Sequence, residues 1–419
     1  MNRPPSRLME NSGRLNLLIM GLVVGGLLVA GLLSGGGGGS TPSIIPPTVT
    51  PTPSSGALTP GAIADVHPPD APFAVDETVV ADCAPDDTIC LVQAYANLAF
   101  RSGPKVALEQ IAAETRPEVV FACHQISHRI GAAALAANGD RAGAAFVAGD
   151  ATCASGYYHG VLQHAFLDVD LGDLAAIGRR AGKICVDPEI QATGYLAFQC
   201  GHGLGHGLLI ATGYDLPMAL EACAALPNEY ETEWCTSGVH MENFTPSYGR
   251  QTAWVSADDL RYPCNVLQPE QGKASCYNIV AIRAIEGSGQ RWEAVAAACG
   301  AAEAEYQEIC FEGMGLQIQG RISSPQEGLE LCAIAAAFAP TCVEGIAASF
   351  VNDYVNGIEA LRVCAAVSEG AQAAACAVRV GSALRATTAT SAQAVEACRA
   401  AIRPESRAIE ADCIRGASR

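Results

Sequence analysis

Apolar residues recur at intervals of three and four in the stretches that precede several cysteines of this chain. Residues 291–299 (RWEAVAAAC) and 326–332 (QEGLELC) are two clear cases, and that spacing is typical of an amphipathic helix. Alanine is abundant and aromatic residues make up only 6% of the chain, which favours closely packed helices over strands. The pattern therefore predicts an all-α fold built from units of helix, short turn and helix.

A second apolar stretch, this one uninterrupted, lies near the N-terminus. The run from Leu17 to Leu33 carries no charge and follows Arg3, Arg7 and Arg14. Seventeen residues at about 1.5 Å per residue give roughly 25 Å, which is just enough to span the hydrocarbon layer. Basic residues before the run and none directly after it place residues 1–15 in the cytoplasm. We expect a transmembrane signal-anchor at residues 16–34, a single pass of the plasma membrane, and the bulk of the chain outside the cytoplasm.

A cleaved signal peptide is the alternative to this anchor. No small-x-small cleavage site closes the run, and no cysteine follows it that could take a lipid. Both interpretations export the rest of the chain.

The stretch after the apolar run is low in complexity. Five consecutive glycines at 35–39 are followed by a tract rich in Pro, Thr and Ser. Such a composition cannot bury a core, so residues 35–75 are predicted to be a flexible, disordered linker. Beyond it we expect a histidine-rich helical repeat region at 76–245 and a C-terminal array of disulfide-stapled repeats at 246–419.

All 18 cysteines lie beyond the predicted anchor, and an even number of cysteines in an exported chain indicates disulfides. From Cys185 onward they form pairs 10 to 15 residues apart that recur every 32 to 41 residues. A period in this range is typical of stacked helical hairpins, so we expect a solenoid in which one disulfide staples each hairpin. Closing a loop of about 12 residues contributes roughly 3 kcal/mol in the chain-entropy model. The predicted bridges are Cys83–Cys90, Cys123–Cys153, Cys185–Cys200, Cys223–Cys235, Cys264–Cys276, Cys299–Cys310, Cys332–Cys342, Cys364–Cys376 and Cys398–Cys413.

Two alternatives to this pairing stay open. The first four cysteines are irregularly spaced, so cross-pairing among them is compatible with the sequence. Reduced structural or metal-binding thiols are the other alternative, although the spacing fits no zinc-finger pattern and the exported context opposes it.

The repeated phrase also carries a family resemblance. An alanine-rich run ends in a cysteine before the turn, as in 294–299, and Cys-x-x-Gly follows the turn, as in Cys310 to Gly313. Over roughly residues 171–416 these features resemble the cysteine-rich version of Sel1-like repeats, which are helical hairpins with an internal disulfide. The cysteine spacing is wider here, and the tyrosine and glycine at the end of that repeat are mostly missing. The resemblance implies a superhelical architecture and no particular function, because such repeats are binding scaffolds with varied partners.

The charge balance excludes one class of partner. The chain has 25 basic and 43 acidic residues, a net charge of −18. The negative electrostatic field of such a chain repels a phosphate backbone, and the sequence has no stripe of basic residues that could follow one. Nucleic-acid binding is therefore not expected.

Histidine is distributed unevenly along the repeats. Seven of the eight lie between His124 and His240, and the repeats after His240 have none. His124 and His128 follow one cysteine, and His202 and His206 follow another. Each pair is four residues apart, so its members share one helix face and are able to hold one metal ion.

Two further phrases extend this set, Gly156-Tyr-Tyr-His159 and Gly238-Val-His240-Met-Glu242. Equivalent positions of successive hairpins line one face of a solenoid, so these side chains should converge from four neighbouring units. Because the thiols are expected in disulfides, the ligands must be nitrogen and carboxylate oxygen, which suits Zn, Cu or Fe. The predicted ligands are His124, His128, His159, His202, His206 and His240, with Glu242 as general base or additional ligand. Six histidines and one glutamate are more than the four ligands of one tetrahedral metal ion. They could therefore hold two metal ions, or one ion with an open coordination position.

Several other residues near these motifs are ambiguous. Glycines 201, 203, 205 and 207 indicate either close helix approach or a backbone wrapped near a ligand. With tight packing alone, His202 and His206 would be hydrogen-bonded core residues. His164 is expected to have a supporting or structural role, and His67 to be solvated in the linker. Four more side chains either shape a substrate site or pack between hairpins, namely Tyr157, Tyr158, Trp234 and Asn243.

The sequence leaves three functions open. The first is a metal-dependent hydrolase or oxidoreductase, although His-Glu-x-x-His, Gly-x-Ser-x-Gly and Cys-x-x-Cys-His are all missing from the chain. The second is a non-enzymatic scaffold that binds a peptide, a glycan or another envelope protein on its concave face, with the histidines structural or pH-sensitive. The third is haem or metal storage, and the low aromatic content argues against a haem pocket.

Overall fold

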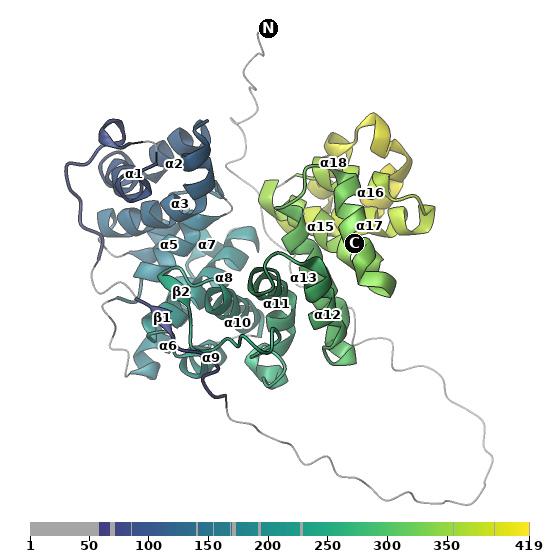
Figure 1. Ribbon diagram of the computed structural model, residues 1–419. Coiled ribbons are helices and arrows are strands. Elements are labelled where there is room, and N and C mark those ends of the chain that lie inside the picture. Colours follow the sequence, from purple (N-terminus) through teal and green to yellow (C-terminus); the bar gives the residue numbers. More distant parts are fainter. Residues whose placement is uncertain are drawn as a thin grey trace, which may run out of the picture.

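The computed structural model describes residues 58–67, 72–84, 86–139, 141–153, 155–167, 169, 173–191, 194–226, 229–354, 356–388 and 390–418 (Figure 1). The predicted cytoplasmic segment, the signal-anchor at 16–34 and most of the predicted linker lie outside the described residues.

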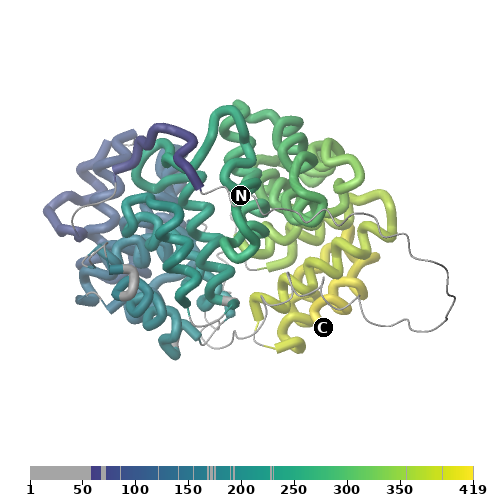
Figure 2. Tube along the Cα trace, turned by 90° about the horizontal axis from the view of Figure 1, so that it is seen from below, coloured from purple at the N-terminus to yellow at the C-terminus, as the bar shows by residue number. Residues whose placement is uncertain are grey.

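The described part of the chain is mostly helical, as predicted. One row of helices runs through the molecule, and each helix of this row contacts the next. The row consists of α1 (Thr88–Ser102), α3 (Pro117–Ala137), α5 (Gly156–His164), α8 (Gly194–Ala211), α10 (Glu229–Phe244), α11 (Lys273–Gly287), α13 (Ala304–Gln319), α15 (Ala339–Tyr354), α17 (Gly370–Thr387) and α19 (Glu410–Ala417). The array curves on itself (Figure 2), so that α17 comes into contact with α8.

Shorter helices pack against this row. They are α2 (Pro104–Ala112), α4 (Ala142–Val147), α6 (Leu174–Ile184), α7 (Pro188–Gln191), α9 (Leu216–Ala224), α12 (Trp292–Gly300), α14 (Pro325–Cys332), α16 (Ile358–Ala366) and α18 (Ser391–Ala401), with the 3-10 turns η2 (Val80–Asp82), η3 (Pro269–Gln271), η4 (Ala333–Phe338) and η5 (Pro404–Ile409). The two helices expected from apolar spacing before Cys299 and Cys332 are α12 and α14. They alternate with row helices and produce the helical pairs that the period indicates.

Nine disulfides join the same cysteines that the spacing pairs, and no cysteine among the described residues is free. This number of bridges indicates an oxidising compartment outside the cytoplasm. Among the pairs from Cys185 onward, one departs from the expected helix–turn–helix: Cys264 lies in a stretch of turns rather than at a helix end. Its bridge to Cys276 ties those turns to the first part of α11.

The recurring Cys-x-x-Gly phrase is explained by how the row helices pack. A Cβ atom on Gly313 would lie 1.8 Å from the backbone oxygen of Asn278, and one on Gly345 would lie 2.1 Å from that of Glu312. A Cβ atom on Gly416 of α19 would likewise lie 2.0 Å from the backbone oxygen of Val378 on α17, the preceding helix of the row. No real Cβ fits at such distances, so glycine is required for successive row helices to touch backbone to backbone.

A short antiparallel pair of strands departs from the all-helical prediction. β1 (Asp65–Val66) pairs with β2 (Gly249–Gln251), and the backbone N–H of Gly61 donates to the oxygen of Ala253 at 2.8 Å. Residues 58–67 therefore lie on the folded part, although the composition places them in the linker. The exposed side chain of His67 agrees with the expectation that it is solvated.

One described stretch, Pro325–Tyr354, is long and apolar enough to cross a membrane by length and composition alone. It comprises α14, η4 and α15, and its backbone turns at Ala336 (φ 52°, ψ −113°). The Cys332–Cys342 bridge closes this bend, and α15 packs against both α13 and α17. Within this stretch, α15 is a helix of the row and α14 packs against α15.

Candidate metal centre

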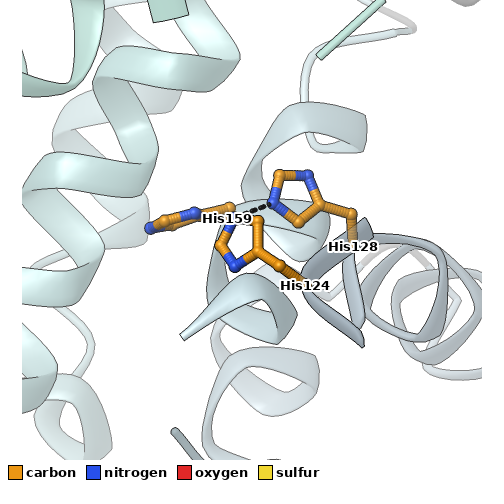
Figure 3. Close-up of side chains that lie close together, drawn as sticks. All are labelled: His124, His128 and His159. Atoms are coloured by element: carbon orange, nitrogen blue, oxygen red, sulfur yellow. Dashed lines mark hydrogen bonds between the residues drawn. The ribbon is translucent and has the colours of Figure 1, made fainter. Parts of the chain in front are cut away.

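Five of the six predicted histidine ligands converge at one place in the row. His124 and His128 lie on α3, His159 on α5, and His202 and His206 on α8. They form two groups of three that share His159, and within each group the candidate ligand nitrogens lie within 4.8 Å of one another. Figure 3 shows the first group, with a dashed line joining ring nitrogens of His124 and His128 beside His159.

The close approach of neighbouring helices brings these rings together. A Cβ atom on Gly160 of α5 would lie 1.8 Å from the backbone oxygen of His128, and one on Gly238 of α10 would lie 1.8 Å from that of His202. The four alternating glycines of α8 likewise face atoms of α5 or α10. Of the two explanations for these glycines, close helix approach is the one that the structure shows.

The hydrogen bonds of the first group fix where its protons lie. The Nδ1 atom of His124 is 2.8 Å from the backbone oxygen of Cys153, and a carbonyl oxygen only accepts, so Nδ1 carries the hydrogen. The Nδ1 atom of His128 is 3.0 Å from Oε1 of Gln163. The two Nε2 atoms then face each other at 2.9 Å.

The orientation of the Gln163 amide follows from a chain of donors that ends on a carboxylate. Ser247 has a single hydroxyl hydrogen, which it donates to Oε2 of Glu242 at 2.8 Å. The Oγ atom must therefore accept from the amide nitrogen of Gln163, 2.8 Å away. The amide oxygen is left to accept from Nδ1 of His128. The Nε2 atoms of His124 and His128 thus present lone pairs to each other.

Glu242 anchors the second group. Its carboxylate accepts from Nδ1 of His206 at 2.7 Å, from the hydroxyl of Tyr214 at 2.8 Å, and from the backbone N–H and hydroxyl of Ser247. Only an ionised carboxylate can accept all four of these hydrogen bonds. The Nε2 atom of His206 then faces Nε2 of His202 at 3.2 Å.

His202 also contacts a sulfur atom. Its Nε2 atom lies 3.2 Å from Sδ of Met241 on α10, and its buried Nδ1 atom has no hydrogen-bond partner among the described residues. The ring of His159 stacks on that of His206, with centroids 4.6 Å apart, so the two groups form one continuous cluster.

Burial controls the protonation of the cluster. It lowers the pKa of His128, His159 and His202 well below the usual range for histidine, because a charged imidazole is poorly solvated there. Neighbouring imidazoles lower the pKa values further. These three rings are neutral at pH 7, and the ionised Glu242 carboxylate beside them is fully buried.

The two groups differ in their access to solvent. His124 is exposed and His128 half-buried, whereas His202 and His206 are buried, at 8% and 4% exposure. The first group is therefore open to solvent on one side, and the second is closed.

His240 is the predicted ligand that the structure does not bring to the cluster. It is fully buried, and its Nε2 atom bonds to the backbone oxygen of Gln271 at 3.1 Å. In α5 and α8 the clustered residue is the sixth after the cysteine of the repeat, and in α10 that position is Met241. One residue is a rotation of about 100° on a helix, which turns His240 toward η3.

Glu242 lies beside the cluster, where four hydrogen bonds from His206, Tyr214 and Ser247 hold its carboxylate. Its role as a general base or additional ligand stays a prediction. His164 lies outside the cluster, where its Nε2 atom bonds to the Tyr248 hydroxyl at 3.0 Å. That position agrees with the supporting role expected for it.

The four side chains considered as substrate-shaping residues pack within the array instead. Tyr157 bonds to a backbone oxygen of α4, and Tyr158 packs on Phe146. Trp234 packs edge-on against the ring of Phe198. The side-chain amide of Asn243 bonds to the backbone of Trp254.

Gln163, Ser247, Tyr214 and Met241 belong to the cluster and were not predicted. Gln163 and Ser247 are 84 residues apart, and no local pattern connects them. Met241 did have a signal, because it shares the sixth position after a repeat cysteine with His159 and His206. No family model, no curated protein and no solved structure matches this chain.

Proposed function

We propose that this chain is a transition-metal protein whose open metal centre is formed by His124, His128 and His159. The observation that supports this most directly is the 2.9 Å separation of the His124 and His128 Nε2 atoms, each in a ring whose Nδ1 atom is hydrogen-bonded to an oxygen acceptor. That arrangement is the usual one for histidines that bind a metal, in which the second nitrogen donates to a carbonyl or carboxylate.

Two facing lone pairs at this distance repel each other unless a cation lies between them. At the tetrahedral angle, Zn–N bonds of about 2.0–2.1 Å place two ligand nitrogens roughly 3.3–3.4 Å apart, and at a right angle roughly 2.9 Å apart. The Nε2 separation of 3.2 Å in the second group is close to the first value, and the 2.9 Å separation in the first group matches the second. A shared proton is the alternative cation, and the lowered pKa of His128 disfavours it.

Charge balance requires a cation beside Glu242. Its ionised carboxylate is completely buried, and an uncompensated buried charge is strongly unfavourable. The imidazoles of His128, His159 and His202 are neutral, so the compensating charge comes either from His206, which forms an ion pair with Glu242 when its ring is protonated, or from a metal cation in the cluster. Charge balance is therefore compatible with a metal, and the support for one rests on the geometry of the nitrogens.

Three protein ligands and one solvent-facing side are typical of a catalytic rather than a structural metal site. In this proposal the exposed His124 lies at the entrance, and Cys153 and Gln163 hold the ring nitrogens in position. A metal there supplies either an activated water for hydrolysis or a redox centre. The identity of the metal, Zn, Cu or Fe, decides between hydrolase and oxidoreductase.

In our proposal, the rest of the chain positions this centre and tethers it. The signal-anchor at 16–34 would tether it to the plasma membrane, and the row of helices would be a solenoid related in architecture to Sel1-like repeats. A peptide or envelope protein on the concave face is a further expectation. The competing function is a scaffold in which the same histidines are only a buried polar network.

Metal analysis of the full-length protein, purified with its disulfides intact, tests the proposal. We expect at least one equivalent of Zn, Cu or Fe per chain, and its loss in His128→Ala. His240→Ala is the matched control, because it removes a buried histidine outside the cluster and should keep the metal. Wild-type protein that is metal-free and takes up none of the three ions would refute the proposal. For metal-loaded protein, a turnover screen with ester, phosphoester and phenol substrates separates an enzyme from a storage protein.

A further inference from the structure

The second group has a donor that the first lacks, the thioether of Met241. Its Sδ atom lies 3.2 Å from Nε2 of His202, and that nitrogen lies 3.2 Å from Nε2 of His206. The lone pair of His206 Nε2 is free for a metal because Nδ1 donates to Glu242. The Nε2 atom of His202 thus has the sulfur of Met241 and the Nε2 atom of His206 each at 3.2 Å.

These donors are built into the fold rather than gathered from a mobile surface. His202 and His206 are buried, Met241 is half-buried, and α8 and α10 are in backbone contact through Gly205 and Gly238. Met241 occupies on α10 the repeat position that carries His159 on α5 and His206 on α8. The row therefore presents the imidazoles of His159 and His206 and the thioether of Met241 at equivalent places on three successive helices.

We propose that His202, His206 and Met241 form a second, closed metal site that selects copper(I). Thioether sulfur is a soft ligand that favours Cu(I) over Zn(II) and over Mg- or Ca-like cations, whereas three imidazoles alone do not discriminate in this way. The site is closed to solvent on the side of His202 and His206, so it suits an ion that is held or relayed rather than one that binds substrate. The inference rests on the proposed function in that both sites share one histidine cluster.

The disulfides make the sulfur ligand easy to recognise. All cysteines among the described residues are bridged, so a sulfur atom bound to copper must come from methionine. Met314 provides a matched control, because it is a fully buried methionine on the row helix α13, in the part of the chain that has no histidine.

The test uses the full-length oxidised protein, loaded with Cu(I) under anaerobic conditions. We expect X-ray absorption to show a sulfur neighbour of copper, and a competing Cu(I) chelator to give at least a tenfold weaker affinity for Met241→Leu than for wild type. Met314→Leu should match wild type in both measurements. Copper without a sulfur neighbour, or Met241→Leu with wild-type affinity, overturns the inference.

The two proposals fail in distinguishable ways. Zn(II) uptake that is lost in His128→Ala, together with copper that lacks a sulfur neighbour, removes the second site and leaves the first. Protein that binds Cu(I) through sulfur but takes up no metal in a manner sensitive to His128→Ala removes the first and leaves the second. Failure to bind either ion removes both.

Discussion

The Nδ1 atom of His206 lies 2.7 Å from a carboxylate oxygen of Glu242, and this pair joins α8 to α10 inside the cluster. The same carboxylate accepts from Ser247, which accepts from Gln163, which in turn accepts from His128. One buried anion therefore orients an imidazole in each of the two histidine groups.

Replacing this anion should weaken metal binding without unfolding the protein. Glu242→Gln keeps the shape and an acceptor for His206 but removes the negative charge that balances the metal. We expect a 10- to 100-fold loss of metal affinity, measured by competition with a chelator at pH 7. Glu344→Gln, a half-buried carboxylate on α15, should bind as wild type. An equal loss in both variants would show a general effect of charge instead.

Ser247→Ala tests whether the two groups are connected. The substitution removes the hydroxyl that links Gln163 to Glu242 and leaves the Gln163 amide free to turn. The Nδ1 atom of His128 then loses its fixed acceptor, so we expect about a tenfold loss of affinity at the open centre. Ser247→Thr retains the hydroxyl and should restore most of the affinity. A Ser247→Ala variant with unchanged metal binding would disprove the link.

Row glycines should be sensitive to a single methyl group. Gly313→Ala places a Cβ atom 1.8 Å from a backbone oxygen of α11, so α13 must move, and we expect a loss of several kcal/mol in the free energy of unfolding. A Cβ atom in Gly300→Ala, at the end of α12, meets no atom of another described element within 4 Å, so this variant should be neutral or stabilising by up to about 1 kcal/mol. Urea unfolding of the oxidised protein measures both. Similar stability for the two variants would contradict the close packing.

We predict that the titration of His164 makes the stability of the metal-free protein depend on pH. Burial, aided by the charge of Arg129, lowers its pKa to about 4. Above pH 6.5 the ring is neutral in both the folded and unfolded states, and it adds no pH dependence. Between pH 6.5 and about 4 the unfolded chain binds a proton that the folded chain does not, so stability falls as the pH falls. The full loss is roughly 3 kcal/mol.

His164→Gln should flatten this part of the stability curve. The variant has no proton to bind in either state, so its free energy of unfolding should fall less between pH 6.5 and 4 than that of wild type. Urea titrations at three pH values in this interval give the comparison. Parallel curves for the two proteins would mean that His164 titrates normally in the folded state.

The sequence anticipated those features that depend on local spacing. Bridges between cysteines 10 to 15 residues apart, such as Cys299–Cys310, follow from the period of one hairpin. The pairs His124–His128 and His202–His206 share a helix face because four residues are about one helical turn. Their restriction to the first repeats was visible without any structure.

The tertiary structure decided which of these side chains meet. His240 and Met241 are neighbours in the chain, and the rotation of α10 within the row turns the imidazole toward Gln271 and the sulfur toward His202. Gln163, Tyr214 and Ser247 join the cluster through loops and helices far apart in sequence. The sequence by itself determined the helical units, the disulfides within them and the candidate histidine ligands, because each of these features arises within one hairpin. Only packing between hairpins determined the ligand set, because a shift of one residue on a helix changes the face on which a side chain lies.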